Sequence, residues 1–275
     1  KVCLEQIGGN SQKLEFILGS ELYHNNDLYW LTFIEISKNT TLARIQRSID
    51  IMGRKLKEEI DFAKLCYPPM QVADIFAIGA NLVHAGLDQR KAHVIARDVA
   101  LKLKFKPLLD KNKKPIKPIA LHHHILLGLA KPPKWPITES ELKEILVELK
   151  MSKSKPESCV FIHDSKEEVE SKILRAFCPP KETLFNPPLD WLVNLVLPIK
   201  KEISIKTSEG IKKYKEHDKA KILKDYQNGL IHPLDLKEVL IKNLWEILEP
   251  IHNHFKNEKF KKILQQLEVK KHDGK

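Results

Sequence analysis

Residues 149–158 read LKMSKSKPES, a stretch that places three lysines and three serines on a short segment interrupted by Pro156. A helix-like pattern, TESELKEILVELK, precedes it, and a strand-like run, SCVFIHD, follows it. A cationic, hydroxyl-bearing loop between two ordered elements suits a polyphosphate, because its ammonium groups can meet oxygens whose charge grows during displacement at phosphorus. The alternative is an ordinary solvated lysine loop, which is common in a lysine-rich chain.

The composition narrows the class of protein and its partners. The 275 residues are enough for one large domain or two ordinary ones. Lysine and arginine exceed aspartate and glutamate by 47 − 36 = 11. This excess favours a polyanionic partner, first nucleic acid and second an anionic membrane surface. The alternative explanation is the charged, lysine-rich surface of a thermophile protein.

Membrane and disulfide signals are missing from the sequence. No apolar run approaches the length that spans a bilayer, and no secretory signal pattern opens the chain. The four cysteines (Cys3, Cys66, Cys159 and Cys178) lie far apart and form neither a disulfide framework nor a zinc-site spacing. We therefore expect a protein of the reducing cytoplasm with no membrane partner.

Residues 67–76 read YPPMQVADIF and carry a first set of candidate binding residues. The two prolines predict a helix break, after which Gln71 and Asp74 share one face of a new helix because they are three residues apart. Tyr67 lies just before the break. A hydroxyl, an amide and a carboxylate suit an α-amino group and a polar side-chain tip. The alternative is a helix start with a capping carboxylate.

Residues 84–93 read HAGLDQRKAH and carry a second set. Gly86 permits a close approach of the backbone, and Asp88 at a helix start suits a sugar hydroxyl. Arg90 and Lys91 extend outward from the same helix, and His93 is assigned a structural role. Further on, three consecutive histidines, residues 122–124, cannot all face one way on a strand, which argues against a metal site there.

Residues 40–54 read TTLARIQRSIDIMGR and predict a helix whose apolar stripe excludes Arg44, Arg47 and Arg54. These arginines suit phosphates or base edges, although ordinary solvated charge explains them equally well. The last third of the chain predicts helices almost throughout, beginning with a capping-box pair at Ser165 and Glu168. A turn there, GLIHPLD, carries His232 and Asp235.

Together these segments resemble an archaeal-type tyrosyl-tRNA synthetase of class I over nearly the whole chain. KMSKS at residues 150–154 is similar to the second signature of class I synthetases, and the pair YPPMQVADIF and AGLDQRKAH resembles the tyrosine enzymes. HPLDLK resembles their anticodon-reading turn. The resemblance implies an α/β fold with a Rossmann-like catalytic domain at residues 1–164. That domain would lack its first strand–helix unit and would carry the helical insertion and the KMSKS loop. An all-helical anticodon-binding domain would follow at residues 165–275.

The resemblance also implies a role for each candidate residue. The substrate tyrosine would contact Tyr67, Gln71, Asp74 and Gln89. ATP would contact Gly86, Asp88, Lys150, Met151, Ser152, Lys153 and Ser154. Of these, Lys150 and Lys153 would be catalytic, stabilising the leaving pyrophosphate. The acceptor end of the tRNA would contact Arg47, Arg90 and Lys91. The anticodon would contact His232 and Asp235, and only Ile211 and Tyr214 lie nearby as candidates to stack on its first base.

The implied activity is a tyrosine–tRNA ligase that uses ATP with Mg²⁺, holds no tightly bound cofactor, and charges tRNA(Tyr) in the cytoplasm as a homodimer through roughly residues 20–60. One departure stands out, because the family's first signature, His-x-Gly-His, does not occur in these 275 residues. We expect that about the first third of such an enzyme precedes Lys1. Two alternatives stay open: a non-catalytic tRNA-binding fragment or paralogue, and a different nucleotidyl transferase, which the YPPMQVAD and GLDQRK pair disfavours.

Overall fold

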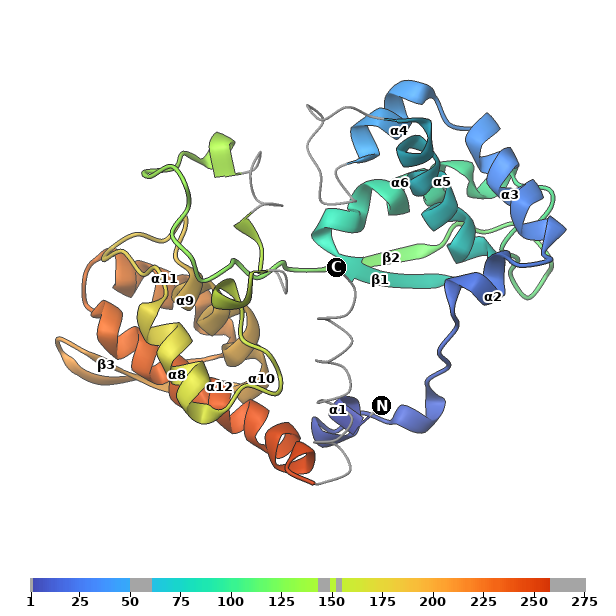
Figure 1. Cartoon of the computed structure of the whole chain (residues 1–275). Helices are drawn as coiled ribbons and strands as arrows, with labels where there is room; N and C mark the ends of the chain where they lie inside the picture. Colours follow the sequence, from blue (N-terminus) through green and yellow to red (C-terminus); the bar gives the residue numbers. More distant parts are fainter. Residues whose placement is uncertain (1, 50–60, 143–148, 152–154, 258–275) are drawn as a thin grey trace. The chain divides into compact units, whose positions relative to one another are not determined.

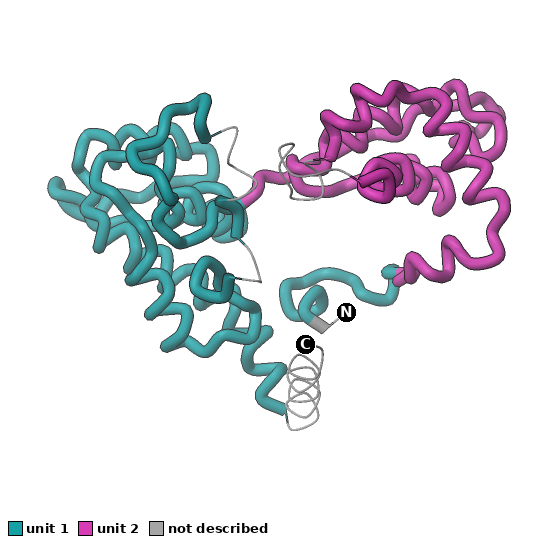
Figure 2. The backbone as a smooth tube through the Cα atoms, turned by 45° about the horizontal axis from the view of Figure 1, so that its top comes forward, with its two compact units in different colours: residues 1–14, 126–275 teal, residues 15–125 magenta. Residues whose placement is uncertain are grey.

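The computed structural model describes residues 2–49, 61–142, 149–151 and 155–257 (Figure 1). The chain forms two compact units (Figure 2). The first consists of Lys1–Leu14 and Leu126–Lys275, and the second is Glu15–Ile125. These bounds differ from the boundary predicted near residue 164. The assignment of catalytic and anticodon-binding roles to either side of residue 164 stays a prediction.

The unit Glu15–Ile125 consists of helices on a short parallel sheet. Its elements are α2 (Gly19–Tyr23), α3 (Asp27–Lys38), α4 (Leu42–Ser48), α5 (Phe62–Ala77), β1 (Leu82–Gly86), the 3-10 turn η3 (Leu87–Gln89), α6 (Arg90–Val99), the 3-10 turn η4 (Ala100–Lys102) and β2 (Ile119–His123). Strands β1 and β2 pair in parallel, from Leu82 opposite Ile119 to Gly86 opposite His123. Because α6 connects them, this segment is a β–α–β unit, as expected for an α/β fold.

Helices α5 and α6 supply most of the core of this unit. The buried face of α6 carries Ala92, Ile95, Ala96 and Val99 at helical spacing. Helix α5 adds Val72 and Phe76, which are fully buried. This apolar packing fixes the two helices whose other residues form the candidate sites.

Helix α5 corrects one prediction. We expected Pro68 and Pro69 to break the helix before Gln71, but α5 runs unbroken from Phe62 to Ala77. Asp61 caps its start, accepting a hydrogen bond of 2.9 Å from the Lys64 backbone N–H. Both prolines are buried, so their rings contribute apolar packing that offsets the lost hydrogen bonds. Tyr67 therefore lies on the same helix as Gln71 and Asp74.

The apolar run LEFIL at residues 14–18 predicts a strand that stops at Gly19, and this prediction is also wrong. This apolar run has no regular structure, and α2 begins at Gly19. The Glu21 carboxylate accepts a hydrogen bond of 3.2 Å from the Leu18 backbone N–H, which favours a helix start. The run is exposed, with Phe16 at 67%.

The unit formed by Lys1–Leu14 and Leu126–Lys275 is mainly helical. Its elements are α1 (Val2–Gln6), η1 (Ser11–Lys13), η5 (Pro156–Ser158), α8 (Lys166–Arg175), α9 (Pro187–Trp191), the π-helical turn η6 (Leu192–Val196), α10 (Leu197–Lys200), β3 (Glu202–Thr207), β4 (Gly210–Lys215), η7 (Glu216–Asp218), α11 (Lys219–Gln227) and α12 (Pro233–Phe255). The predicted capping box at Ser165 and Glu168 is confirmed at the start of α8.

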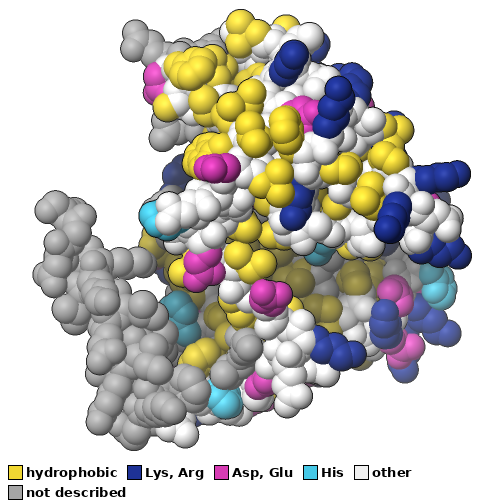
Figure 3. Space-filling view, turned by 90° about the vertical axis from the view of Figure 1, so that its right-hand side faces the viewer, with side chains coloured by type: hydrophobic (Ala, Val, Ile, Leu, Met, Phe, Trp, Pro, Cys, Tyr) yellow, Lys and Arg dark blue, Asp and Glu magenta, His cyan; other side chains and the backbone are white. Residues whose placement is uncertain are grey.

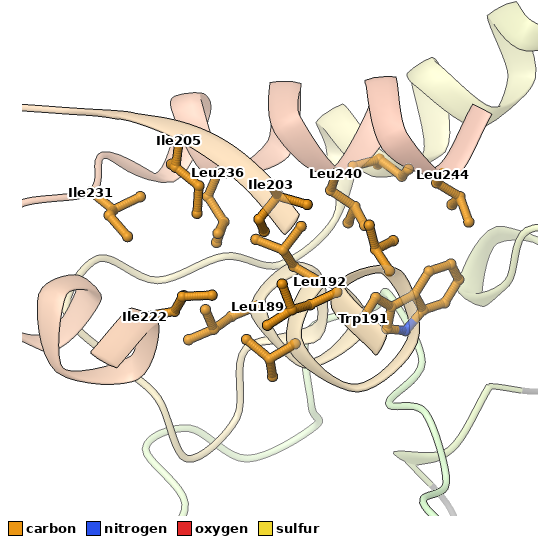
Figure 4. Close-up of a cluster of buried hydrophobic side chains, with 14 of the residues drawn as sticks. Leu189, Trp191, Leu192, Ile203, Ile205, Ile222, Ile231, Leu236, Leu240 and Leu244 are labelled. Carbon is orange, nitrogen blue, oxygen red and sulfur yellow. The ribbon is translucent and has the colours of Figure 1, made fainter. Parts of the chain in front are cut away.

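The core of this unit lies between α12 and the α9–η6 segment (Figure 4). Leu236, Leu240 and Leu244 project from one face of α12 at i, i+4 and i+8 toward Trp191 and Leu192. The Trp191 indole N–H donates a hydrogen bond of 2.7 Å to the Leu127 carbonyl. The bond ties the segment that pairs with Lys150 to this core.

The prediction that residues 165–275 are all-helical is wrong. Strands β3 and β4 form an antiparallel hairpin, with Thr207 opposite Gly210 next to the turn. Gly210 has a φ of +108°, a conformation that glycine adopts readily. Ile203, Ile205 and Tyr214 are buried while the residues on either side of them are exposed. This alternation of buried and exposed side chains is typical of a strand with one face on the core.

The run SCVFIHD also differs from its prediction, because it forms no strand. Asp164 accepts a hydrogen bond of 2.8 Å from the Phe161 backbone N–H, which closes a turn. The same carboxylate pairs with Lys172 at 2.6 Å, and both side chains are at most 10% exposed. This pair ties the turn to α8.

Candidate functional site

One face of α5 carries three of the four residues predicted to bind tyrosine. Tyr67, Gln71 and Asp74 follow each other at helical spacing. Gln89, from η3, joins them because the Gln71 side-chain amide donates a hydrogen bond of 2.9 Å to the Gln89 side-chain oxygen. The structure thus brings the predicted group together within one unit.

Asp74 is the acceptor at one end of this group. The Tyr29 hydroxyl, from α3, donates a hydrogen bond of 2.9 Å to its carboxylate, and the Tyr23 hydroxyl also interacts with it. Burial raises the pKa of Asp74, and the two phenols lower it in part by stabilising the charged form. Burial, followed by the charge of Asp74, raises the pKa of both Tyr23 and Tyr29. The result is a carboxylate arranged to accept hydrogen bonds from phenols.

Gln71 offers a second acceptor. Among the described residues, its side-chain oxygen is buried and has no hydrogen-bond partner. A buried oxygen in this state costs free energy, which a donor from a ligand would recover. Tyr67, nearer the start of the helix, is 45% exposed. The face of α5 therefore presents a carboxylate and an unsatisfied amide oxygen one helical turn apart.

Gly86 and Asp88 lie together at the carboxyl end of β1. A Cβ atom on Gly86 would come within 2.6 Å of an Asp88 carboxylate oxygen and 3.6 Å of His123 Nε2. Because Gly86 has no side chain, the Asp88 carboxylate can lie directly against the backbone here. The end of a parallel strand is also where α/β folds bind nucleotides.

Arg47, Arg90 and Lys91, predicted to contact the tRNA acceptor end, line one surface pocket together with Arg44. The Lys91 ammonium group donates a hydrogen bond of 2.8 Å to the Arg47 backbone carbonyl, which joins α6 to α4. The structure thus brings Arg47 together with Arg90 and Lys91, which follow it by 43 and 44 positions. We name this pocket, lined by Arg44, Arg47, Arg90 and Lys91, the arginine pocket.

Lys150 and Met151 are held against the chain at residues 126–128. Lys150 forms an antiparallel bridge with Leu127, and the Met151 backbone N–H donates a hydrogen bond of 3.0 Å to the Leu126 carbonyl. Ser152, Lys153 and Ser154 lie outside the described residues. Asp88 and Lys150 belong to different units, so their action on one ATP molecule stays a prediction.

His232 and Asp235 lie at the start of α12. His232 caps the helix, with Nδ1 accepting a hydrogen bond of 3.2 Å from the Leu234 backbone N–H. Asp235 forms an ion pair of 3.3 Å with Lys206, which is paired with Ile211 in the hairpin. The hairpin and the helix start thus form one surface.

The two stacking candidates beside that surface differ in exposure. Ile211 is 76% exposed on the hairpin. Tyr214 is fully buried, and its hydroxyl donates a hydrogen bond of 2.7 Å to Asp225. Tyr214 therefore cannot stack on a base in this conformation, and Ile211 is the exposed side chain of the two.

The histidines of the strands form two pairs. His93 Nδ1 lies 2.9 Å from His122 Nε2, and His123 Nδ1 lies 3.1 Å from His84 Nε2. Burial is the main cause that lowers the pKa of His93 and of His122. Within the part of the chain that the structure describes, no group of three or more metal-ligating side chains comes together. His93 is buried, in keeping with its predicted structural role.

The sequence of the chain matches a known protein family. The model of class I tRNA synthetases for tryptophan and tyrosine (W and Y) matches residues 4–249. A tyrosine–tRNA ligase of Thermococcus sibiricus is 52% identical over 269 residues, which span 93% of this chain and 68% of that protein. The chain belongs to the class I tyrosyl-tRNA synthetases.

Solved structures of the family agree in fold. The tyrosyl-tRNA synthetase of Pyrococcus horikoshii, solved with L-tyrosine, has a TM-score of 0.81 and 49% identity, covering 92% of this chain and 68% of that one. The synthetase of Aeropyrum pernix has a TM-score of 0.75 and 32% identity, covering 98% of this chain and 70% of that one. The described helices include none that is long and apolar enough to cross a membrane.

Sequence reasoning missed two tyrosines that contact Asp74. Tyr23 and Tyr29 lie 51 and 45 positions before Asp74, so no local spacing connects them with it. The sequence could have indicated only that a helix starts at Asn26, a residue type that caps helices. Its side chain accepts a hydrogen bond of 3.0 Å from the Tyr29 backbone N–H. That capping position orients α3, but only the packing of α3 on α5 shows where the hydroxyl points.

Proposed function

We propose that the chain acts as a tyrosine–tRNA ligase, which activates tyrosine with MgATP to tyrosyl-adenylate and transfers the tyrosyl group to tRNA(Tyr). The observation that carries this proposal is the pair of acceptors on α5, the Asp74 carboxylate and the unpartnered Gln71 oxygen. A phenol hydroxyl and an ammonium group, the two donors of tyrosine, match these two acceptors.

Selection against phenylalanine follows from Asp74. A ligand without a phenol hydroxyl would cover a half-buried carboxylate and leave it with fewer donors, which is costly. Sites built to bind a substrate hydroxyl in this way reject the analogue without it by a factor on the order of 10⁴ to 10⁵. In our proposal Tyr67 and Gln89 complete the pocket, with Gln89 holding the Gln71 amide so that its oxygen faces the ligand.

The chemistry is an in-line attack of the tyrosine carboxylate on the α-phosphate of MgATP, with pyrophosphate leaving. In the proposal Asp88 holds the ribose beside Gly86. Lys150 and Met151, with Ser152, Lys153 and Ser154 beyond the described residues, hold the phosphates. Lys150 and Lys153 stabilise the charge that grows on the leaving group. The terminal hydroxyl of tRNA then attacks the adenylate, and no covalent enzyme intermediate forms.

Two surfaces serve the tRNA. The arginine pocket suits the acceptor end, because planar guanidinium groups hydrogen-bond base edges and phosphates in pairs. His232 and Asp235 suit the anticodon, with Asp235 accepting from its first base after leaving Lys206. Both surfaces act in the cytoplasm, where protein synthesis takes place.

An apolar groove supports the proposed homodimer. Phe33, Ile34, Leu42, Phe62 and Leu65 line it, between α3, α4 and α5. Ile34, Leu42 and Phe62 are between 58% and 79% exposed, and hydrophobic side chains gather broadly on the face shown in Figure 3. Exposed apolar surface of this kind marks an interaction site. A second copy of the chain is the partner that we propose.

The alternative is a chain that binds tRNA(Tyr) without forming the adenylate, because His-x-Gly-His does not occur in the 275 residues. Tyrosine-dependent exchange of pyrophosphate into ATP distinguishes the two. Exchange supports the ligase, whereas tRNA binding without exchange supports the binding protein.

A variant tests the tyrosine pocket itself. Asp74→Ala should lower tyrosine affinity by about tenfold to a hundredfold, the value of a hydrogen bond to a charged group, and leave tRNA affinity unchanged. Isothermal titration with each ligand measures both effects. Equal losses of both affinities would contradict the pocket assignment.

A further inference from the structure

A second pocket adjoins the arginine pocket and shares Arg44, Arg47 and Ile95 with it. Its other polar lining includes Thr40, Thr41, Asp98, Lys102 and Lys117. We name this second pocket the lysine groove. The two pockets adjoin each other across α4, α6 and the ends of the segment that joins α6 to β2.

Positive charge dominates the two pockets. The described lining contains six basic side chains (Arg44, Arg47, Arg90, Lys91, Lys102 and Lys117) and one acidic side chain, Asp98. Asp98 forms an ion pair with Arg44 at the junction of the two pockets. Both partners are about half exposed, so a polyanion could displace the carboxylate at little cost.

The fold holds both lysines of the groove in place. Lys102 ends η4, between the buried residues Ala100 and Leu103. The backbone N–H of Lys104, two residues on, donates hydrogen bonds of 2.9 and 3.0 Å to the Glu35 carboxylate on α3. The backbone at Lys102 is therefore anchored, while its side chain is exposed and lines the groove.

Lys117 is fixed from the other side. Arg97 of α6 donates a hydrogen bond to the carbonyl of Pro118, the next residue. The backbone N–H of Ile119 then donates a hydrogen bond of 2.8 Å to the Asn81 carbonyl, where β2 begins. Lys102 and Lys117 are thus 15 positions apart in sequence but line one groove.

The two pockets differ in the chemistry they offer. The arginine pocket presents planar guanidinium groups, which suit base edges. The lysine groove adds ammonium groups and the hydroxyls of Thr40 and Thr41, which suit phosphate and sugar oxygens. Its described lining contains no aromatic side chain, so base stacking is not what it offers.

We propose that the lysine groove binds the sugar–phosphate backbone of the RNA whose end enters the arginine pocket. This inference rests on the proposed function, because it takes the partner of the arginine pocket to be tRNA. In this proposal, Lys102 and Lys117 each neutralise one phosphate. Arg44 leaves its ion pair with Asp98 and pairs with a third phosphate. The contacts position the RNA and carry no sequence information.

The test measures equilibrium binding of the full chain to two RNAs between 50 and 200 mM salt. One is a tRNA(Tyr) transcript, and the other is the same transcript with its first base pair exchanged. Lys102→Ala and Lys117→Ala should each reduce the salt slope, d log K/d log[salt], by about 0.9, the value of one lost phosphate contact. For the fourfold rise in salt, wild type then loses about 3.5-fold more affinity than each variant. Both variants should weaken the two RNAs equally.

Matched controls separate the groove from general charge. Lys111→Ala removes an exposed lysine of the same connecting segment that lines neither pocket, and it should leave the slope unchanged. Asp98→Asn removes the competing carboxylate and should tighten binding of both RNAs. A thermal melt of each variant verifies its fold.

The outcomes distinguish the two proposals. If Arg90→Ala weakens discrimination between the RNAs while Lys102→Ala and Lys117→Ala leave the slope unchanged, the lysine groove is overturned and the proposed function stands. Slope changes as large for Lys111→Ala as for Lys102→Ala would also overturn it, because the effect would then be general charge. If the chain binds neither RNA, both proposals fall. An acidic peptide whose binding is weakened by Lys102→Ala and Lys117→Ala, and which does not compete with RNA, would assign the groove to another partner and overturn the inference.

Discussion

The Tyr29 hydroxyl donates a hydrogen bond of 2.9 Å to the Asp74 carboxylate. Tyr29 is 1% exposed, and its hydroxyl also lies 3.2 Å from the Met70 carbonyl. The carboxylate is thus held on α5 by a phenol from α3. The proposed substrate offers the same phenol group, so its hydroxyl would make a hydrogen bond of the kind that Asp74 already accepts from Tyr29.

Asp74→Asn should stabilise the fold at neutral pH. The pKa of Asp74 is raised in the folded state, mainly by burial, so folding favours its protonated form. Its contribution to stability is therefore fully present below the unfolded pKa and is lost as pH rises through the folded value. The asparagine side chain that replaces it does not titrate, so the Asp74→Asn variant should not lose this stability as the pH rises. Urea unfolding of both proteins from pH 3 to pH 8 measures the difference, which should grow with pH.

Asp61→Asn is the matched control on the same helix. The pKa of Asp61 is lowered because its carboxylate accepts the Lys64 backbone N–H, so its contribution is present above the unfolded pKa and is lost toward acid. This variant should be slightly less stable than wild type at neutral pH, the opposite sign. The same sign for both variants would contradict the burial of Asp74.

Gln71→Met should separate stability from binding. The substitution keeps the side-chain volume. It removes a buried oxygen that has no partner among the described residues, and it also removes the hydrogen bond to Gln89, so stability should change little. It also removes the proposed acceptor of the ammonium group. Calorimetry with tyrosine and with its analogue lacking the amino group should show a preference for tyrosine in wild type and none in the variant. An unchanged preference would exclude Gln71 from ammonium binding.

The His93–His122 pair should make the stability of the unit Glu15–Ile125 fall at acidic pH. Burial is the main cause that lowers both pKa values. The charge of His122 lowers the pKa of His93 further, and the charge of Arg90, followed by those of His84 and His123, lowers the pKa of His122 further. The unfolded chain then binds protons more readily, so stability is present above about pH 6.5 and falls as the solution becomes more acidic. His122→Gln should flatten the fall between pH 7 and pH 5 in unfolding experiments. A profile as steep as wild type would contradict this origin.

Asp164→Ala should destabilise the unit formed by Lys1–Leu14 and Leu126–Lys275 by about 3 to 5 kcal/mol, because it leaves the buried Lys172 ammonium unpaired. The exposed pair of Lys201 and Glu216 provides the control, since Glu216→Ala should cost at most about 1 kcal/mol. Urea unfolding at pH 7 measures both. A loss of unfolding free energy of similar size in the two variants would contradict the larger contribution expected from the buried pair.

Ile211→Phe should strengthen binding of a tRNA(Tyr) anticodon stem–loop. The position is 76% exposed on the hairpin that Asp235 contacts through Lys206. An aromatic ring there could stack on a base, a contact that contributes about 1 to 3 kcal/mol. Fluorescence anisotropy with the stem–loop measures the gain. Lys213→Phe, on the same strand, is the control and should give no gain.

Local patterns predicted several parts of the site correctly. The spacing of Gln71 and Asp74 placed them on one helical face, and the capping-box pair Ser165 and Glu168 marked the start of α8. The helical spacing of Leu236, Leu240 and Leu244 also predicts an apolar face, and these residues are buried on α12. Each of these features depends on neighbours within about one or two turns, which the sequence shows directly.

Other parts could not be read from local patterns. Pro68 and Pro69 predicted a break, but the burial of α5 outweighs their cost. The segment from Gly210 to Lys215 has a lysine-rich sequence that suited a helix, yet it pairs with β3 because Tyr214 is buried in the core. In both cases long-range packing overrides local preference.

The sequence by itself determined the chemistry of the molecule: its positive charge, the acceptors of α5, the arginines and lysines of its helices, and its resemblance to a synthetase family. Only the tertiary structure decided which of these groups meet. It set Tyr29 against Asp74, Arg47 beside Lys91, and Lys102 in one groove with Lys117. The physical reason is that such contacts join residues 15 to 45 positions apart, and they form only when the apolar faces of separate elements pack together.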